Sequence, residues 1–389
     1  MKLSGLIADM SNRLVLLSSE RNRIFELALS GLKPLNVSQT GSVGFRNPLL
    51  VRRSKEILRY GVSLGSLIGE LKSLMPDVLV VSERDDTRNI LPTLFRELPN
   101  TRFISVQSAW YFESAHLHLW WPGERNRLTI LAWGQYMIDL AAKQGRDIRG
   151  RLAAGSLEAS IFSDFFTVSP SEIRDNQICL IVKRKFGREG SQPTNVSLQR
   201  QLNVESVVRL TAGYCRIVGM RAVIPVDKRR DSKQREADEA WLDGLGVGDC
   251  IGFSQDCGTL QTTLPHWWSM NGDTTPPEPE EFRALAVAST SALVIGVPNS
   301  AVIWQSIALG LPVLAAGFGD HPFFDFPAPG PWKITNATST EFFARAEQLR
   351  MLPNHRFSRE QVSESQYFID QSPSNRTVLT LRKLVREGQ

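Results

Sequence analysis

Apolar runs alternate with amphipathic stretches along most of the chain. Apolar stretches predict strands at Asp77–Val81, Thr101–Val106 and Ala292–Val297, and the last is an apolar run without alternation, which predicts burial on both faces. Segments with an apolar period of about 3.6 residues predict helices between the strands, for example Arg53–Leu74 and Leu198–Met220. Strands that alternate with helices of this length are typical of βαβ units and a parallel sheet.

This alternation breaks once, near Phe162–Asn176, in a segment rich in Ser, Pro and Asp. The break predicts an α/β protein with two Rossmann-like domains that face each other across a cleft. We expect the first domain over residues 1–165, a linker over 166–176 and the second domain over 177–352. Residues 353–389 have a helical pattern and could pack back on the first domain.

Composition and charge narrow the function classes. Hydrophobic residues make up 42% of the chain and charged residues 22%, which argues against disorder. No apolar run approaches the roughly 20 residues of a membrane-spanning helix, and Asp9 and Arg13 interrupt the short N-terminal apolar patch, so we expect a cytoplasmic protein. The net charge of +5 suits a phosphate-bearing ligand or an anionic membrane surface. No nucleic-acid-binding module is present in the sequence, and we expect no nucleic-acid partner.

The most specific segment is Ala292–Asp325, which predicts a strand, a tight turn, a helix and a second strand. Pro298, Asn299 and Ser300 end the first strand, and Asn299 or Ser300 is a ready N-cap for the helix. A helix N-terminus at the carboxyl end of a buried strand suits an anion such as a nucleotide phosphate. Gln305, one turn further, could hydrogen-bond a ribose or sugar hydroxyl. The alternative is an ordinary N-cap on a buried helix.

Two further loops follow predicted strands of the second half. The basic side chains that could surround a phosphate after the first of these strands are Lys183, Arg184, Lys185 and Arg188. Gly187 would let the backbone come close to that phosphate, whereas a solvated basic loop is the alternative. In the loop near the end of the specific segment, Asp320 and His321 could bind a base or a sugar.

Candidate general bases lie in the loops of the first half. Glu83 and Asp85 follow one predicted strand, and Glu113 and His116 follow the next. At most one of them would deprotonate an acceptor hydroxyl, and each could instead be a surface or capping group. Because His116 and His118 lack a matching carboxylate pair, we expect no metal site. No glycine-rich fingerprint follows the first strand, which argues against NAD or FAD.

Five short segments follow one another in a characteristic order: PDVLVVSERD, RFISVQSAW, ILAWGQYMIDL, RLAAGSLEASIF and SALVIGVPNSAVIWQSIALGLPVLA. This order resembles that of the GT-B glycosyltransferases of bacterial surface polysaccharide biosynthesis. The resemblance implies a metal-independent transferase without a cofactor, whose second domain holds a nucleotide-sugar donor and whose first domain binds a glycan or glycolipid acceptor. It also implies that peripheral contact with the inner face of an anionic membrane could occur.

Two departures from this family leave alternatives open. Gln305 stands where such transferases usually carry a Glu for the donor ribose, and Ser108 and Ala109 stand where relatives often have a His or Asn followed by a Gly. A sugar-nucleotide epimerase shares the architecture, and a catalytically degenerate GT-B binding protein would share it too. A polyol-phosphate transferase would usually show a His at the position of Ser108.

Overall fold

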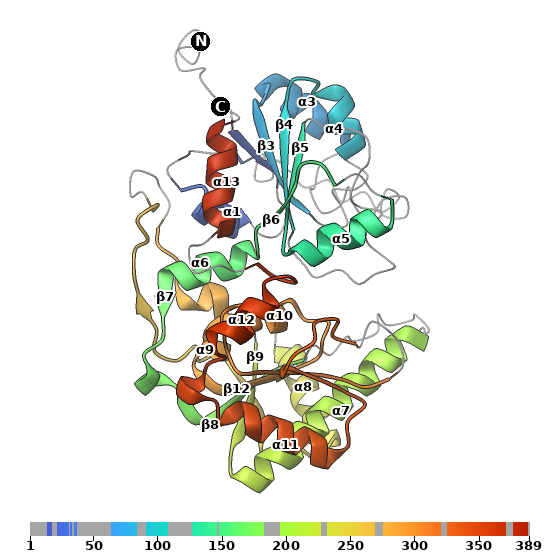
Figure 1. Cartoon of the computed structure of the whole chain (residues 1–389), viewed down its shortest axis with the longest axis vertical. Helices are drawn as coiled ribbons and strands as arrows, with labels where there is room; N and C mark the ends of the chain where they lie inside the picture. Colours follow the sequence, from blue (N-terminus) through green and yellow to red (C-terminus); the bar gives the residue numbers. More distant parts are fainter. Residues whose placement is uncertain are drawn as a thin grey trace. The chain divides into compact units, whose positions relative to one another are not determined.

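A computed structural model of the chain shows two compact units (Figure 1). The described residues are 14–17, 22–30, 32, 35–36, 64–83, 91–107, 127–145, 148–182, 195–226, 232–268, 275–319, 325–370 and 376–387. Unit 1 consists of Met1–Ile161, Leu264–Pro276 and Asp370–Gln389, and unit 2 consists of Phe162–Thr263 and Pro277–Ile369. The end of the chain therefore returns to unit 1.

Unit 1 is built on a parallel sheet of order β2-β1-β3-β4-β5-β6. Its strands are β1 (Leu14–Leu17), β2 (Leu35–Asn36), β3 (Val78–Glu83), β4 (Arg102–Gln107), β5 (Leu128–Ala132) and β6 (Arg151–Ala153). Its helices are α1 (Asn22–Ala28), α3 (Leu64–Leu74), α4 (Leu91–Glu97), α5 (Gln135–Lys143) and α13 (Arg376–Glu387). Helix α6 (Leu157–Phe165) carries the chain into unit 2. This strand order is that of a doubly wound sheet.

Unit 2 is built on a second parallel sheet, of order β10-β9-β8-β12-β13-β14. Its strands are β8 (Arg174–Ile181), β9 (Arg221–Pro225), β10 (Ile251–Ser254), β12 (Ser291–Gly296), β13 (Val313–Gly317) and β14 (Lys333–Thr335). In chain order this is 3-2-1-4-5-6, the order of a Rossmann sheet. The expected α/β class with two Rossmann-like units is confirmed.

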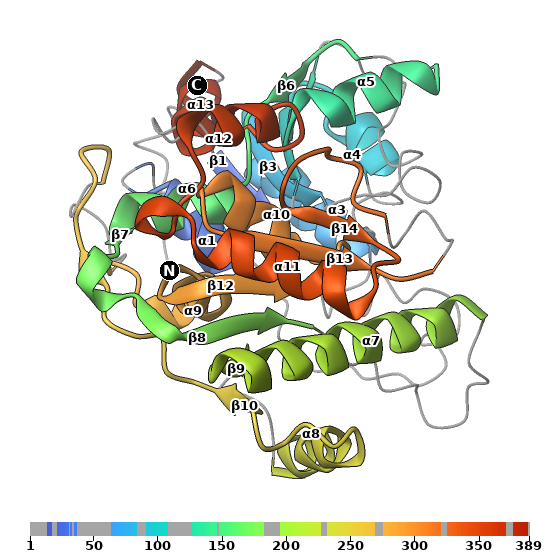
Figure 2. The same ribbon diagram turned by 60° about the horizontal axis from the view of Figure 1, so that its bottom comes forward.

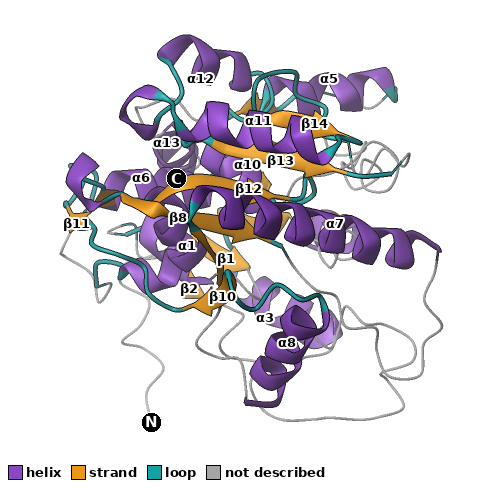
Figure 3. Ribbon diagram, turned by 90° about the horizontal axis from the view of Figure 1, so that it is seen from below, coloured by secondary structure: helices purple, strands orange, loops and turns teal. Residues whose placement is uncertain are grey.

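Helices cover both faces of the unit 2 sheet. They are α7 (Asn195–Val218), α8 (Ser232–Gly244), α9 (Arg283–Ser289), α10 (Ala301–Ala308), α11 (Ser339–Arg350) and α12 (Arg359–Ser365). α7 and α11 lie side by side, as Figures 2 and 3 show, and the Tyr214 hydroxyl of α7 donates a hydrogen bond of 2.5 Å to Glu347 of α11. Short elements complete the unit: β7 (Phe166–Thr167), β11 (Gln261–Thr262) and the 3-10 turns Pro170–Glu172, Pro279–Phe282 and Pro353–His355.

Strand β8 begins at Arg174, inside the segment expected to be a linker. Its first four residues are exposed or half-buried, and only its last four are buried. A polar segment at the exposed start of a strand has no apolar pattern, so the pattern predicted a strand from Gln177 onward. The ladder with β12 nevertheless begins at the pair Arg174 and Ser291.

The C-terminal helix α13 packs within unit 1 through a buried arginine. Arg382 is 5% exposed, and its guanidinium donates hydrogen bonds to the carbonyls of Ala28 (3.0 Å) and Ser30 (2.8 Å) at the end of α1. It also lies 5.4 Å from the ring centroid of Trp267. A cation beside the last carbonyls of a helix is favourable because those carbonyls lack partners within the helix.

Candidate functional site

The carboxyl ends of β8 and β12 form the switch point of the unit 2 sheet. The chain leaves β8 toward β9 and leaves β12 toward β13, on opposite sides. Open parallel sheets bind their ligands at such a point. At the end of β12, a Cβ atom on Gly296 would lie 2.6 Å from the backbone oxygen of Ile181 and 2.7 Å from Cδ1 of Ile303. Only glycine therefore allows β8, β12 and α10 to approach each other this closely.

The turn that connects β12 to α10 is anchored by a buried tryptophan. The indole N–H of Trp304 donates a hydrogen bond of 3.1 Å to the carbonyl of Pro298, across the turn. Trp304 is 1% exposed, and its ring stacks on Phe326 with the ring centroids 3.8 Å apart. The buried tryptophan therefore fixes the turn that contains Asn299 and Ser300.

The N-terminus of α10 is called open here because its N-cap side chain makes no capping hydrogen bond. Ser300 occupies the N-cap position, as predicted, but its side chain makes no capping hydrogen bond. By contrast, Thr338 caps α11 and Ser358 caps α12, each through a capping box. The first turn of α10 carries no acidic side chain, and Asn299 and Ser300 are both half-buried. Uncapped N–H groups together with the helix dipole favour a bound anion.

Two asparagine side chains hold the start of the loop after β13. The Phe318 N–H donates to Oδ1 of Asn203 on α7, and the Gly319 N–H donates to Oδ1 of Asn336, each at 2.7 Å. β13 is the immediate neighbour of β12 in the sheet. This loop therefore starts beside the carboxyl end of β12. Sequence patterns did not indicate either asparagine, because each acts on residues distant in the chain.

The structure brings together only some of the predicted site residues. Asn299 and Ser300 lie in the turn at the switch point. Gln305 has no exposed surface, so a ligand reaches it only if surrounding groups move. Glu83 is the last residue of β3, and its side chain lies outside the described part of the chain. Also outside the described residues are Asp85, Glu113, His116, Lys183, Arg184, Lys185, Arg188, Asp320 and His321.

In unit 1, three of the short segments that carry the family resemblance meet at one junction. Oε1 of Gln107 accepts a hydrogen bond of 2.8 Å from the backbone N–H of Trp133, and the Trp133 indole donates one of 3.0 Å to the Gln107 carbonyl. The Trp133 carbonyl accepts the N–H groups of Gly155 (3.1 Å) and Asp370 (2.6 Å). Gln107 and Trp133 are 1% and 0% exposed. This geometry gives the motifs a structural role at the ends of β4 and β5.

Replacing Gln107 with Leu is expected to lower the free energy of unfolding by about 1–3 kcal/mol, because it leaves the buried Trp133 N–H without its acceptor. The matched control is Gln135→Leu, since the Gln135 amide bonds Asp139 on the exposed surface of α5 and its loss should change stability by less than about 0.5 kcal/mol. Urea unfolding measures both. Equal losses in the two variants would contradict the structural role of Gln107.

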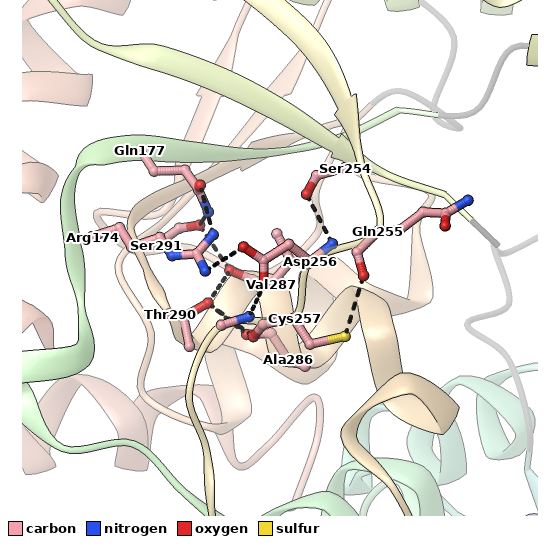
Figure 4. A network of polar contacts seen from close by, with 11 residues as sticks. Arg174, Gln177, Ser254, Gln255, Asp256, Cys257, Ala286, Val287, Thr290 and Ser291 are labelled. Carbon is pink, nitrogen blue, oxygen red and sulfur yellow. Dashed lines mark hydrogen bonds and ion pairs between the residues drawn. The ribbon is translucent and has the colours of Figure 1, made fainter. Parts of the chain in front are cut away.

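A separate polar network ties together the amino ends of β8 and β12 (Figure 4). Arg174 pairs with Asp256 at 2.6 Å, and the Gln177 amide donates to the Ser291 hydroxyl at 3.0 Å. Hydrogen bonds from the Gly258 N–H and from Arg174 lower the pKa of Asp256. The network lies at the opposite end of these strands from the switch point, and its described groups bond to one another.

The remaining chemistry of the described residues points to no metal or thiol centre. All four cysteines are buried and free, and burial raises the pKa of Cys215 to about 12, so its thiol is a poor nucleophile. Within the described ranges, no group of three or more His, Cys, Asp or Glu side chains could hold a metal ion. None of the helices in those ranges is long and apolar enough to span a bilayer.

Comparison with known proteins identifies the fold. No family model and no curated protein sequence matches the chain. Among solved structures it resembles the UDP-GlcNAc 2-epimerase of Neisseria meningitidis bound to UDP-GlcNAc, with 13% identity over 96% of this chain and 100% of that chain and a TM-score of 0.53. It also resembles the UDP-N-acetylglucosamine 2-epimerase of Rickettsia bellii, with 11% identity over 97% of each chain and a TM-score of 0.54.

A glycosyltransferase of Rickettsia africae shows the same likeness, with 9% identity over 97% of this chain and 100% of that chain and a TM-score of 0.50. The likeness spans nearly the full length of each of these proteins, and at such low identity it concerns the fold. It agrees with the two Rossmann-like sheets of units 1 and 2. The GT-B fold expected from the sequence resemblance is confirmed.

Proposed function

We propose that unit 2 binds a nucleotide-sugar at the open N-terminus of α10 and that the chain transfers the sugar to a glycan or glycolipid acceptor in surface polysaccharide biosynthesis. One observation carries the proposal: a helix N-terminus without a side-chain cap at the switch point of a sheet of order 3-2-1-4-5-6, where Gly296 allows β8, β12 and α10 to pack closely. The GT-B fold supports it, because proteins of this fold with a nucleotide-sugar ligand are among its structural neighbours.

In this proposal the N–H groups of Ala301 and Val302 donate to phosphate oxygens, and the helix dipole stabilises the negative charge that grows on the leaving nucleotide. No metal or other cofactor is needed for that role. Unit 1 binds the acceptor, and one of its candidate bases takes the proton of the attacking hydroxyl. The candidate bases are Glu83, Asp85, Glu113 and His116.

Other side chains have proposed roles in donor binding. The basic side chains that would add positive charge near the phosphates are Lys183, Arg184, Lys185 and Arg188. Gln305 would bond a hydroxyl of the ribose once the groups that bury it move, and Asp320 and His321 would contact the base or sugar. We further propose that the reaction takes place in the cytoplasm, with peripheral contact at an anionic membrane when the acceptor is a glycolipid.

Nucleotide binding is expected to raise the melting temperature of the wild-type chain. A ligand at 100 times its Kd adds about 2.7 kcal/mol to the stability of the native state, which corresponds to a rise of roughly 3 °C for a chain of 389 residues. The panel contains UDP, GDP and CMP, each with a matching nucleotide-sugar. The bare nucleosides are the controls, because they lack the phosphate that α10 would hold. If no member of the panel raises the melting temperature, the proposal is contradicted.

Epimerisation of a nucleotide-sugar is the second candidate, because two of the three structural neighbours described above are epimerases, with the higher TM-scores of 0.53 and 0.54. An epimerase changes the configuration of one sugar carbon without any acceptor, which proton NMR detects. A transferase releases nucleotide only when an acceptor is present. A degenerate binding protein gives the thermal shift with neither reaction.

A further inference from the structure

Arg283 brings a buried positive charge to the carboxyl end of the unit 2 sheet. It is the first residue of α9, which leads into β12 and packs against β8, β9 and β12. Arg283 is 8% exposed, and its Nη1 donates a hydrogen bond of 2.7 Å to the carbonyl of Val226, the residue that follows β9. The guanidinium therefore lies at the edge where open parallel sheets bind their ligands.

The described residues offer no anion that neutralises this charge. Nε of Arg283 is buried without a hydrogen-bond partner, and within the ranges that the structure describes no carboxylate forms an ion pair with the guanidinium. The thiol of Cys257 lies near it, but burial raises the pKa of this thiol, and Arg283 opposes only part of the rise. The thiol therefore stays neutral. Because a buried charge without a counter-ion is costly, a positive charge retained here favours an anionic ligand.

Arg382 of unit 1 shows how the chain satisfies a buried arginine that has a structural role. Its guanidinium donates to the carbonyls of Ala28 and Ser30 and lies against the ring of Trp267. Arg283 has only one carbonyl, a neutral thiol and an Nε without a partner. It therefore has hydrogen-bond donors to spare, and it has them at the ligand-binding edge of its sheet.

Arg283 and the N-terminus of α10 lie at the same edge of the sheet, with one strand between them. β8 separates β9 from β12, so the ends of β9 and β12 are about 10 Å apart, twice the usual spacing of neighbouring strands. α9 and α10 also pack against each other. A single phosphate group is too small to contact both positions, whereas a ligand with two anionic groups reaches both.

We propose that Arg283 binds a second anionic group of the nucleotide-sugar, in addition to the phosphate at α10. Two groups have this chemistry: the second phosphate of a nucleoside diphosphate and the carboxylate of an acidic donor sugar. A guanidinium suits either group, because it donates charge-assisted hydrogen bonds to phosphate and carboxylate oxygens. The inference rests on the proposed function, since it takes a phosphate of the same ligand to lie at α10.

The test compares Arg283→Met, which removes the charge and keeps much of the side-chain volume, with Arg283→Lys, which keeps the charge. The matched control is Arg345→Met. Arg345 of α11 also donates a hydrogen bond to one backbone carbonyl, that of Pro331 at 2.9 Å, but Pro331 precedes β14 and lies toward the amino end of that strand. If Arg283→Met lowers the melting temperature so far that it does not fold, the neutral and polar Arg283→Gln takes its place.

Calorimetric titration measures Kd for UMP, UDP, UDP-glucose and UDP-glucuronic acid, or for the matching guanosine or cytidine compounds if the wild type binds those more tightly. We expect Arg283→Met to reduce by about tenfold the preference for the ligand with the additional anionic group, which corresponds to one charge-assisted hydrogen bond. Arg283→Lys and Arg345→Met should stay close to the wild-type ratios. A change in the ratio of UMP to UDP assigns the second phosphate, and a change in the ratio of UDP-glucose to UDP-glucuronic acid assigns the carboxylate.

If Arg283 only holds the carbonyl of Val226, Arg283→Met shifts all four Kd values by the same factor or leaves them unchanged, and the inference is overturned. When the wild type binds these ligands and Arg283→Met keeps both ratios, only the inference fails. When the wild type binds none of them, the proposed function fails, and the inference fails with it.

Discussion

Replacing Ser300 with Asp is expected to weaken nucleotide binding at least tenfold while raising the melting temperature. The Ser300 side chain makes no capping bond, and Asp is among the best N-cap residues, so the variant gains about 1 kcal/mol of stability. The same carboxylate lies where the phosphate would bind. Two like charges about 4 Å apart near a protein surface repel by about 4 kcal/mol, which is more than the 1.4 kcal/mol or so of a tenfold loss.

The matched control for this substitution is Ser358→Asp at the N-cap of α12. The Ser358 hydroxyl already accepts the Gln361 N–H, and the neighbouring Phe357 N–H bonds the carbonyl of Gly310, just past the C-terminal end of α10. This cap is therefore remote from the N-terminus of α10. The Kd of the Ser358→Asp variant for nucleotide should equal that of the wild type. An unchanged Kd in Ser300→Asp would contradict the proposal that the N-terminus of α10 binds the phosphate.

Replacing Gly296 with Ala is expected to lower the free energy of unfolding by about 1–3 kcal/mol and to lower nucleotide affinity with it. The new Cβ would lie 2.6 Å from the Ile181 backbone oxygen, which cannot rotate away as a side chain could. β12 and β8 would have to separate at the point where the site is built. Urea unfolding and calorimetric titration measure the two effects.

Gly252→Ala is the matched control because Gly252 also lies in a strand of the same sheet. A Cβ at Gly252 meets no atom within 4 Å, so this variant should keep or slightly exceed the wild-type stability. Equal unfolding midpoints for the two variants would contradict the close approach of β8 and β12 at Gly296.

Much of the fold could be predicted from the sequence because buried parallel strands leave a strong apolar signal. The run at Ala292–Val297 matches β12 within one residue, and every residue of β12 is buried. The start of β8 gave no such signal, since Arg174 and the residues after it face solvent or other polar groups. The apolar pattern of a sequence indicates only which positions are buried. It therefore misses the part of a strand that is paired in the sheet but exposed.

The candidate site was only partly predictable for a different reason. Residue type indicated an N-cap at Asn299 or Ser300, but whether a side chain there turns toward the helix depends on the turn that Trp304 holds. Residues far apart in the chain are joined by the hydrogen bonds between Trp133 and Gln107 and between Phe318 and Asn203. Contacts of this kind follow from the tertiary fold, and no local pattern in the sequence contains them.

The most direct test of the account is a crystal structure of the wild-type chain with the panel nucleotide that raises its melting temperature most. The account predicts a phosphate oxygen within hydrogen-bond distance of the backbone nitrogen of Ala301 or Val302, at the end of β12. A nucleotide bound elsewhere on the chain, with the N-terminus of α10 facing only water, would contradict it.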